Sequence, residues 1–411
     1  MTGKPARSAE HSALHALANR LVDERWYSGI AWKVEHDRIV IDEGACGNAD
    51  HAFERPMNHD AIHRIYSMTK PIVSVAALML IEQGRLRFDD PVERFVPGLG
   101  RAGVLATDGT CAGTMRPITV EDLLTHRAGL SYDFLPGCPV AALYREASVL
   151  ADGSRGLDEL VSLLADLPIA SQPGERWLYS VSIDVLAAVV QSVSDSPLRE
   201  VLKRLFFDPF GMVDTDFGVQ SDSRYRLVDM FGLRELHEPA PIAVIDPQPQ
   251  LEPLNVDESY PVDRASTFAR GGHGLYSTID DYRRFMQVLT DGTGPDGERY
   301  LSEAMVELMW CDRLLPAQKP IAIGARPLPG YGWGLAGRIM SELGEAMQLS
   351  SVGEGGWSGA ASTYFWIDRR WRFNGIVMTQ YLGSPLNLGP DLQTTAYGTL
   401  GAPWGRTTAS D

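Results

Sequence analysis

Ser67 and Lys70 have the residue types and the spacing that nucleophilic catalysis requires. Residues three positions apart lie on one face of a helix, so the serine hydroxyl and the lysine amine can meet there. The positive end of the helix dipole and burial both disfavour the charged form of Lys70. A neutral amine can take the proton of the Ser67 hydroxyl. The pair therefore predicts a serine nucleophile with a lysine as its base.

The segment that follows must form the helix that positions this pair. Residues 72–81 are apolar on nearly every face, which predicts a helix buried on all sides and ending at Gly84. Pro71 lacks an N–H and is tolerated only in the first turn, so the helix must start near Ser67. The N–H of Ser67 then has no intrahelical partner and can bind an oxyanion.

The same spacing also arises by chance, and a surface lysine near a helix cap is its ordinary explanation. Only 5 of the 37 basic residues in this chain are lysines. Arginine cannot lose its proton in a protein, so a basic side chain that acts as a base here has to be lysine. A lysine at the start of the most apolar helix therefore favours the catalytic interpretation.

Composition describes an acidic globular protein. The chain has 411 residues, of which 44% are hydrophobic and 22% charged, and its formal net charge is −16. General binding to nucleic acid or anionic lipid is not expected at this charge. The most apolar stretch is about half of the roughly 20 residues that cross a bilayer, and the N-terminus lacks an apolar signal region. A cytoplasmic protein without a membrane partner is expected, and its oligomeric state stays open.

The cysteines suggest neither a disulfide framework nor a metal site. Cys46, Cys111, Cys138 and Cys311 form no CxxC motif, and no histidine cluster accompanies them. Four unpaired thiols are expected. The predicted serine chemistry needs no metal and no cofactor, and none is expected.

Strand-like patterns cluster at both ends of the chain. Ser28 to Gly47 reads as a hairpin at the edge of a sheet, and residues 362–368 and 372–378 read as two further strands. Between them lie helical patterns with start signals at Thr119, Ser196 and Thr278.

These patterns predict an α/β (α+β) fold. We expect one antiparallel sheet made from both ends of the chain and flanked by helices, with a mainly helical domain inserted between them. The expected segments are 1–95 and 263–411 for the two parts of the α/β domain and 96–262 for the helical one. A long loop at about 215–262, without a sustained period, is expected to cover or line a site.

The motif around Ser67 resembles the active-site region of serine hydrolases related to class C β-lactamases, in particular family VIII carboxylesterases and lovastatin-type acyltransferases. Further matching stretches, in the family's order, are 118–130, 173–180, 271–277 and 353–362. The resemblance runs from about residue 10 to 385. It implies the β-lactamase/transpeptidase-like fold and a serine hydrolase.

The resemblance also implies further site residues. Tyr179 falls at the family's catalytic tyrosine, which can pass a proton between nucleophile and leaving group. The N–H of Ala360 would be the second oxyanion donor, beside that of Ser67. The expected substrate-binding residues are Tyr66, Tyr132, Phe134, Trp357, Ser358 and Gly359.

The sequence departs from the β-lactamase pattern at two positions. Trp357 stands where that family has a cation that holds a substrate carboxylate, and Val181 stands where an asparagine usually follows the tyrosine. An indole cannot replace an ammonium group, and burying an uncompensated carboxylate is costly. Both departures favour neutral, apolar esters over penicillins.

Four functions compete on this basis. The leading hypothesis is a carboxylesterase that forms an acyl-Ser67 intermediate from neutral, short-chain esters and hydrolyses it. An acyltransferase on the same scaffold is the close alternative, followed by a β-lactamase or D-Ala peptidase and, last, a non-catalytic binding protein.

Other residues fit chemistry less well. Ser358 lies in a run close to the G-x-S-x-G pattern, but the run lacks the final glycine and precedes a strand, whereas that elbow needs strand, turn and helix. His126 and His273 lie in glycine-flanked stretches without a carboxylate partner, so structural roles are expected for both.

Overall fold

A seven-stranded antiparallel sheet lies at the centre of the computed structural model, which describes residues 12–106, 108–233, 235 and 251–400. Its strand order is β10-β11-β12-β13-β14-β1-β2. The strands are β1 (Gly29–His36), β2 (Ile39–Gly47), β10 (Tyr331–Trp333), β11 (Arg338–Met340), β12 (Gly355–Ser358), β13 (Tyr364–Asp368) and β14 (Phe373–Met378). Ala31 of β1 pairs with Met378 of β14, so both ends of the chain build one sheet, as the sequence predicted.

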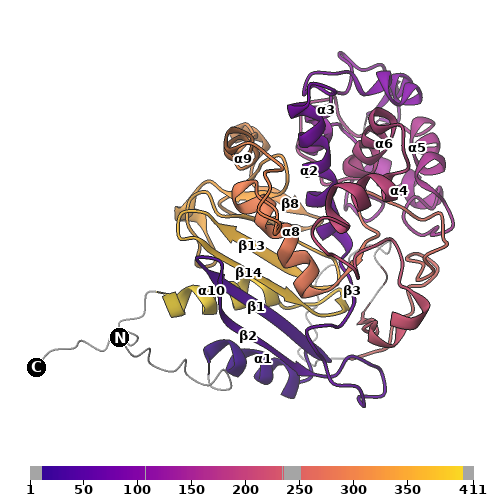
Figure 1. Cartoon of the computed structure of the whole chain (residues 1–411). Helices are drawn as coiled ribbons and strands as arrows, with labels where there is room; N and C mark the ends of the chain where they lie inside the picture. Colours follow the sequence, from indigo (N-terminus) through magenta and orange to yellow (C-terminus); the bar gives the residue numbers. More distant parts are fainter. Residues whose placement is uncertain (1–11, 107, 234, 236–250, 401–411) are drawn as a thin grey trace, which may run out of the picture.

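Helices cover both faces of this sheet. On one face, α1 (Ala13–Asp23) packs against α10 (Leu388–Leu400), and on the other α8 (Ile279–Asp291) crosses β1, β13 and β14 and is followed by α9 (Glu303–Met309) (Figure 1). Neighbouring strand residues face opposite sides: Trp366 packs in the cluster that contains Leu14 of α1, and Phe365 packs in the larger cluster on the other face.

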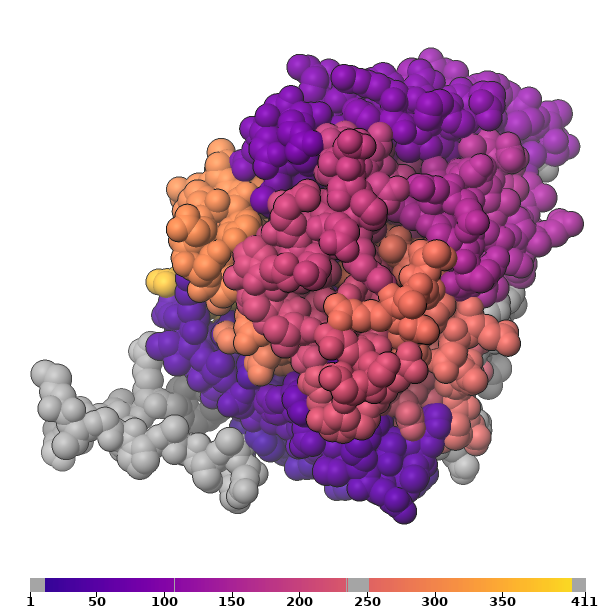
Figure 2. Space-filling view, turned by 45° about the vertical axis from the view of Figure 1, so that its right-hand side comes forward, coloured from indigo at the N-terminus to yellow at the C-terminus, as the bar shows by residue number. Residues whose placement is uncertain are grey.

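The middle of the chain forms a helical region beside the sheet. Its helices are α2 (Thr69–Glu82), α3 (Val120–Leu124), α4 (Pro139–Glu146), α5 (Leu157–Ala165), α6 (Ser182–Ser194) and α7 (Leu198–Leu202). Figure 2 shows the purple and magenta surface of this region above the indigo surface of the N-terminal segment. The expected fold class is therefore confirmed. Within the described residues, no helix is long and apolar enough to cross a membrane.

Short strand pairs tie distant loops together. They are β3 (His63–Arg64) with β7 (Tyr276–Ser277), β4 (Val104–Leu105) with β5 (Cys111–Ala112), β6 (Phe231–Gly232) with β15 (Tyr381–Leu382), and β8 (Ile321–Ile323) with β9 (Arg326–Leu328). The β3–β7 pair brings the residues just before Ser67 next to those that follow His273.

Two of the three helix starts read from the sequence are confirmed. Thr119 caps α3 with a reciprocal bond to Asp122, and Thr278 caps α8. The predicted start at Ser196 is wrong by one residue, because Pro197 and not Ser196 is the N-cap of α7. The proline side chain has no hydrogen-bond acceptor for the N–H groups of the first turn.

The described parts of the loop at about 215–262 contain a turn of 3-10 helix at Ser221–Arg226 and the strand β6. Residues 234 and 236–250 of this loop lie outside the described residues. The Tyr260 ring, from the end of the loop, lies 4.8 Å from the ring of Tyr66, the residue before Ser67. The loop therefore contacts the segment that carries the candidate nucleophile.

Candidate active site

Ser67 lies where a short 3-10 turn, Tyr66–Met68, runs into α2. Every residue of α2 from Thr69 to Leu80 is buried, and Gly84 follows the helix with a φ of +68°. The helix thus starts, is buried and ends as its sequence predicted. Tyr66 has a φ of +44°, which is uncommon for a residue with a side chain and is a local strain next to the candidate nucleophile. Ser67 is partly exposed, so a substrate can reach its hydroxyl.

Lys70 is buried below Ser67 and has three oxygen partners. Its Nζ lies 3.1 Å from Ser67 Oγ, 2.8 Å from Tyr132 Oη and 2.6 Å from the carbonyl of Gly272. An ammonium group donates to all three. A neutral amine has only two hydrogens, and the carbonyl cannot donate, so in that form the hydroxyl of Ser67 or Tyr132 must donate to the nitrogen. The geometry therefore allows proton transfer from Ser67 to Lys70.

Burial lowers the pKa of Lys70 to about 7, and the nearby carboxylate of Asp184 opposes this shift. A group with this pKa is neutral in a large fraction of molecules at neutral pH and can still hold a proton transiently. That is the range in which a general base is most effective.

Tyr179 lies three residues before α6, next to the same amine. Lys70 Nζ lies 4.7 Å from the centre of its ring. Its Oη accepts a hydrogen bond from Nε1 of Trp357 at 3.1 Å. Burial raises the pKa of Tyr179, although hydrogen bonding with Ser67 and Trp357 opposes the rise, so the resting side chain is a neutral phenol. It can donate a proton to a leaving group and regain one from Lys70.

The end of β12 approaches the start of α2. A Cβ added to Gly359 would lie 2.4 Å from the carbonyl oxygen of Ile65, so only glycine permits this approach. Ser358 and Ala360 on either side are partly exposed. Because β12 leads through a turn into β13 and not into a helix, Ser358 does not lie on a nucleophile elbow. The backbone N–H groups of Ser67 and Ala360 remain the predicted oxyanion donors.

The predicted substrate-binding aromatic residues fall into different environments. Tyr132 is buried, bonds to Lys70 and stacks on Phe134 at 4.9 Å, and Phe134 is partly exposed. Trp357 is 1% exposed, and its indole N–H donates a hydrogen bond to Tyr179 Oη. The Tyr66 ring packs into a buried cluster with Tyr260. Direct substrate contact by these side chains stays a prediction.

Both histidines are buried among aromatic rings, and a structural role for each stays a prediction. His126 is fully buried, with its ring 5.0 Å from those of Tyr179 and Trp333, and burial holds its pKa well below the usual value. His273 packs against Tyr260 and Phe268, and burial lowers its pKa as well.

Two residues next to Lys70 were not among the site residues predicted from the sequence. Gly272 supplies the carbonyl that holds Lys70, and Asp184 of α6 accepts a hydrogen bond from the N–H of Gly272 at 2.9 Å. A signal for Asp184 was present, because it is the one charged residue in the apolar run 183–190. The glycine pair 271–272 lies in one of the stretches that carry the family resemblance.

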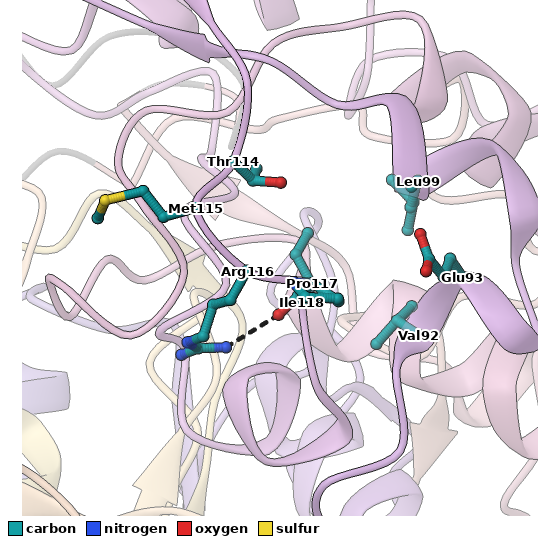
Figure 3. A pocket seen from close by; sticks show the side chains of 9 residues that line it. Val92, Glu93, Leu99, Thr114, Met115, Arg116, Pro117 and Ile118 are labelled. Atoms are coloured by element: carbon teal, nitrogen blue, oxygen red, sulfur yellow. Dashed lines mark hydrogen bonds between the residues drawn. The ribbon is translucent and has the colours of Figure 1, made fainter.

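A pocket of about 260 Å³ lies elsewhere, between the 3-10 turns at 92–101 and the segment before α3 (Figure 3). Arg116, the one cationic residue that lines this pocket, donates hydrogen bonds to the carboxylate of Asp122 and to the carbonyl of Pro117. None of the predicted site residues lines it. Among the described residues, no group of three or more histidine, cysteine or acidic side chains could hold a metal ion.

Comparisons with known proteins agree with this architecture. A family model described as Beta-lactamase matches residues 14–394. The chain is 35% identical over 364 residues to the uncharacterized protein MT1414 of Mycobacterium tuberculosis, with 86% of each chain covered. It is 27% identical over 382 residues to Esterase EstB of Burkholderia gladioli, with 89% of each covered.

A solved structure has the same fold. EstCE1, described as a hydrolase with promiscuous acyltransferase activity, has a TM-score of 0.78 and 24% sequence identity, and the match covers 94% of this chain and 97% of that one. The predicted β-lactamase/transpeptidase-like fold is therefore confirmed.

Proposed function

The chain belongs to the Beta-lactamase family, and from this premise we propose that it is a serine carboxylesterase that hydrolyses neutral, short-chain carboxylic esters through an acyl-Ser67 intermediate. Membership confirms the resemblance read from the sequence, and an esterase among the relatives supports a serine hydrolase. The observation that carries the proposal is the 3.1 Å contact between Ser67 Oγ and the buried amine of Lys70.

The residues of the candidate site support the following sequence of bond changes and proton transfers. Lys70 takes the proton of the Ser67 hydroxyl while Oγ forms a bond to the ester carbon. The N–H groups of Ser67 and Ala360 stabilise the negative charge that develops on the carbonyl oxygen. Tyr179 donates a proton to the departing alkoxide and regains one from Lys70 as the alcohol leaves. In the second half water forms a bond to the acyl carbon and gives a proton to Tyr179, which passes its own proton to Lys70. The bond between the acyl carbon and Oγ then breaks, Lys70 returns the proton to Ser67, and the carboxylic acid leaves.

Trp357 supports neutral substrates over β-lactams that carry a carboxylate. Its indole has one N–H, and that donor is already bonded to Tyr179. A substrate carboxylate at this position would lose a charge-assisted hydrogen bond worth roughly 1.5–3 kcal/mol, which corresponds to about 10- to 150-fold in rate or affinity. A β-lactamase or D-Ala peptidase is therefore the weaker proposal.

Acyl transfer is the second candidate, because EstCE1 is described as a hydrolase with promiscuous acyltransferase activity. Hydrolysis and transfer share the acyl-Ser67 intermediate and differ in whether water or an alcohol attacks it. Adding increasing concentrations of a short alcohol during turnover measures the ratio of ester product to free acid. A ratio that reaches a majority of ester at millimolar alcohol would make transfer the main activity.

The esterase proposal is tested by substrate preference. We expect kcat/KM for a 4-nitrophenyl ester of a short neutral acid to exceed that for a chromogenic cephalosporin by at least the 10-fold that the missing cation predicts. Ser67→Ala provides the blank for both reactions. Equal or higher kcat/KM for the cephalosporin would overturn the proposal in favour of a β-lactamase, and no turnover of any ester would favour a binding protein.

A further inference from the structure

Asp184 is fully buried in α6, and none of the proposed steps uses it. Its Oδ1 accepts a hydrogen bond from the N–H of Gly272 at 2.9 Å. The carbonyl of Gly272, on the other side of the same residue, accepts a hydrogen bond from Lys70 Nζ at 2.6 Å. One residue of backbone therefore connects the carboxyl group to the candidate base.

The packing around this link is tight. A Cβ added to Gly272 would lie 2.1 Å from Asp184 Oδ2, so a larger residue here would have to displace this carboxyl group. Oδ2 is buried and has no hydrogen-bond partner among the described residues. A buried carboxyl oxygen without a partner is costly, so a role beyond satisfying one N–H is expected of this group.

The titratable and charged groups that face Lys70 come from several segments. They are His126, Tyr132, Tyr179, Asp184 and His273, and the cation Arg270 acts on Asp184 and His273. Burial lowers the pKa of both histidines and raises the pKa of both tyrosines, which keeps these four neutral. Arg270 is a cation held by the carbonyls of Val149 and Asp152.

In the proposed reaction Lys70 becomes an ammonium group when it takes the proton of Ser67. A buried ammonium group needs a negative charge nearby, and of the groups just named Asp184 is the one that can supply it. Burial raises the pKa of Asp184, and the charges of Lys70 and Arg270 and the hydrogen bond from the N–H of Gly272 oppose this rise. Resting on the proposed function, we propose that Asp184 is a positioning residue for Lys70: it fixes the Gly272 carbonyl against the amine and supplies the charge that balances its protonated form.

A lysine titration tests this directly. With only five lysines in the chain, ¹³C-labelled lysine gives few NMR signals, and Lys70 is assigned by its loss in Lys70→Arg. Asp184→Asn keeps an acceptor for the Gly272 N–H and removes the charge. Because the ammonium form loses its counter-charge, we expect the pKa of Lys70 to fall by about 1–3 units. The acid limb of the kcat/KM profile should move to lower pH by the same amount.

A matched control carries the same charge change on the surface. Asp222 is exposed in the 3-10 turn Ser221–Arg226, and Asp222→Asn should leave the titration of Lys70 unchanged. Circular dichroism and thermal melting show whether Asp184→Asn folds. If it does not, Asp184→Ser, which removes the same charge with a smaller side chain, is titrated in its place. A folded variant with the wild-type pKa of Lys70 would overturn the inference and leave Asp184 as a structural acceptor.

The titration needs no substrate, so it separates this inference from the proposed function. A shifted pKa in a protein that hydrolyses no ester would support the link between Asp184 and Lys70 and overturn the esterase. An unshifted pKa of Lys70 in an active esterase would overturn the link between Asp184 and Lys70 and would support the proposed function.

Discussion

At the scale of single residues, the proposed chemistry depends on Lys70 changing its charge near neutral pH. With the pKa of Lys70 lowered to about 7, the amine is protonated below this pH and becomes a base above it. We therefore predict that kcat/KM for a neutral ester rises through about pH 7. Lys70→Arg keeps the positive charge but cannot act as a base, and should lower kcat/KM by about 10²- to 10⁴-fold.

Steady-state ester hydrolysis across pH 5–9 checks both parts of this prediction. Lys203→Arg, at a half-exposed position, is the control and should behave as the wild type. Activity in Lys70→Arg within a few-fold of the wild type would mean that Lys70 contributes only its charge.

A second prediction at this scale concerns the indole N–H of Trp357, which donates to Tyr179 Oη. Trp357→Phe keeps an aromatic ring and removes this donor. The loss of one hydrogen bond of about 1 kcal/mol should lower kcat by about 5-fold with little change in KM. Trp371→Phe, at a tryptophan that is 53% exposed, should be neutral. Unchanged kcat in Trp357→Phe would show that Tyr179 is held by other contacts.

At the scale of elements, the site depends on how closely β12 approaches the start of α2. A Cβ at residue 359 would lie 2.4 Å from the Ile65 carbonyl and 2.2 Å from Thr363 Oγ1, so Gly359→Ala should move apart the N–H groups of Ser67 and Ala360, the two predicted oxyanion donors. We expect kcat for ester hydrolysis to fall by about 10²- to 10³-fold, as when one such donor is lost. Gly344→Ala, where a Cβ meets no neighbour, is the control. Full activity in Gly359→Ala would place the oxyanion hole elsewhere.

How much of the site could be predicted from sequence differs between elements. The start, burial and end of α2 were readable, because Pro71, the apolar run and Gly84 act through neighbours along the chain. The contact of Asp184 with Gly272 was not, since 88 positions separate the two residues. The hydrogen bond from Trp357 to Tyr179 joins residues 178 positions apart and depends on how β12 is placed against the segment before α6. Local patterns contain no information on such approaches.

At the scale of the whole molecule, the sheet and the helical region share one hydrophobic core. A single buried cluster contains Ala31 and Ile376 from the sheet together with Leu160 and Val189 from the helical region. We therefore predict one cooperative unfolding transition, with equal calorimetric and van't Hoff enthalpies. Differential scanning calorimetry measures both. Two separate transitions would show that the two regions fold as independent domains.

The proposed catalysis proceeds through an acyl group on Ser67, and covalent labelling detects this group. The protein is mixed briefly with 4-nitrophenyl acetate and quenched in acid, and its intact mass and peptide masses are measured. We expect one acetyl group per chain, located on the peptide that contains Ser67, and neither label nor ester turnover in Ser67→Ala. Undiminished turnover in Ser67→Ala, or a turnover-competent acetyl group on another residue, would contradict it.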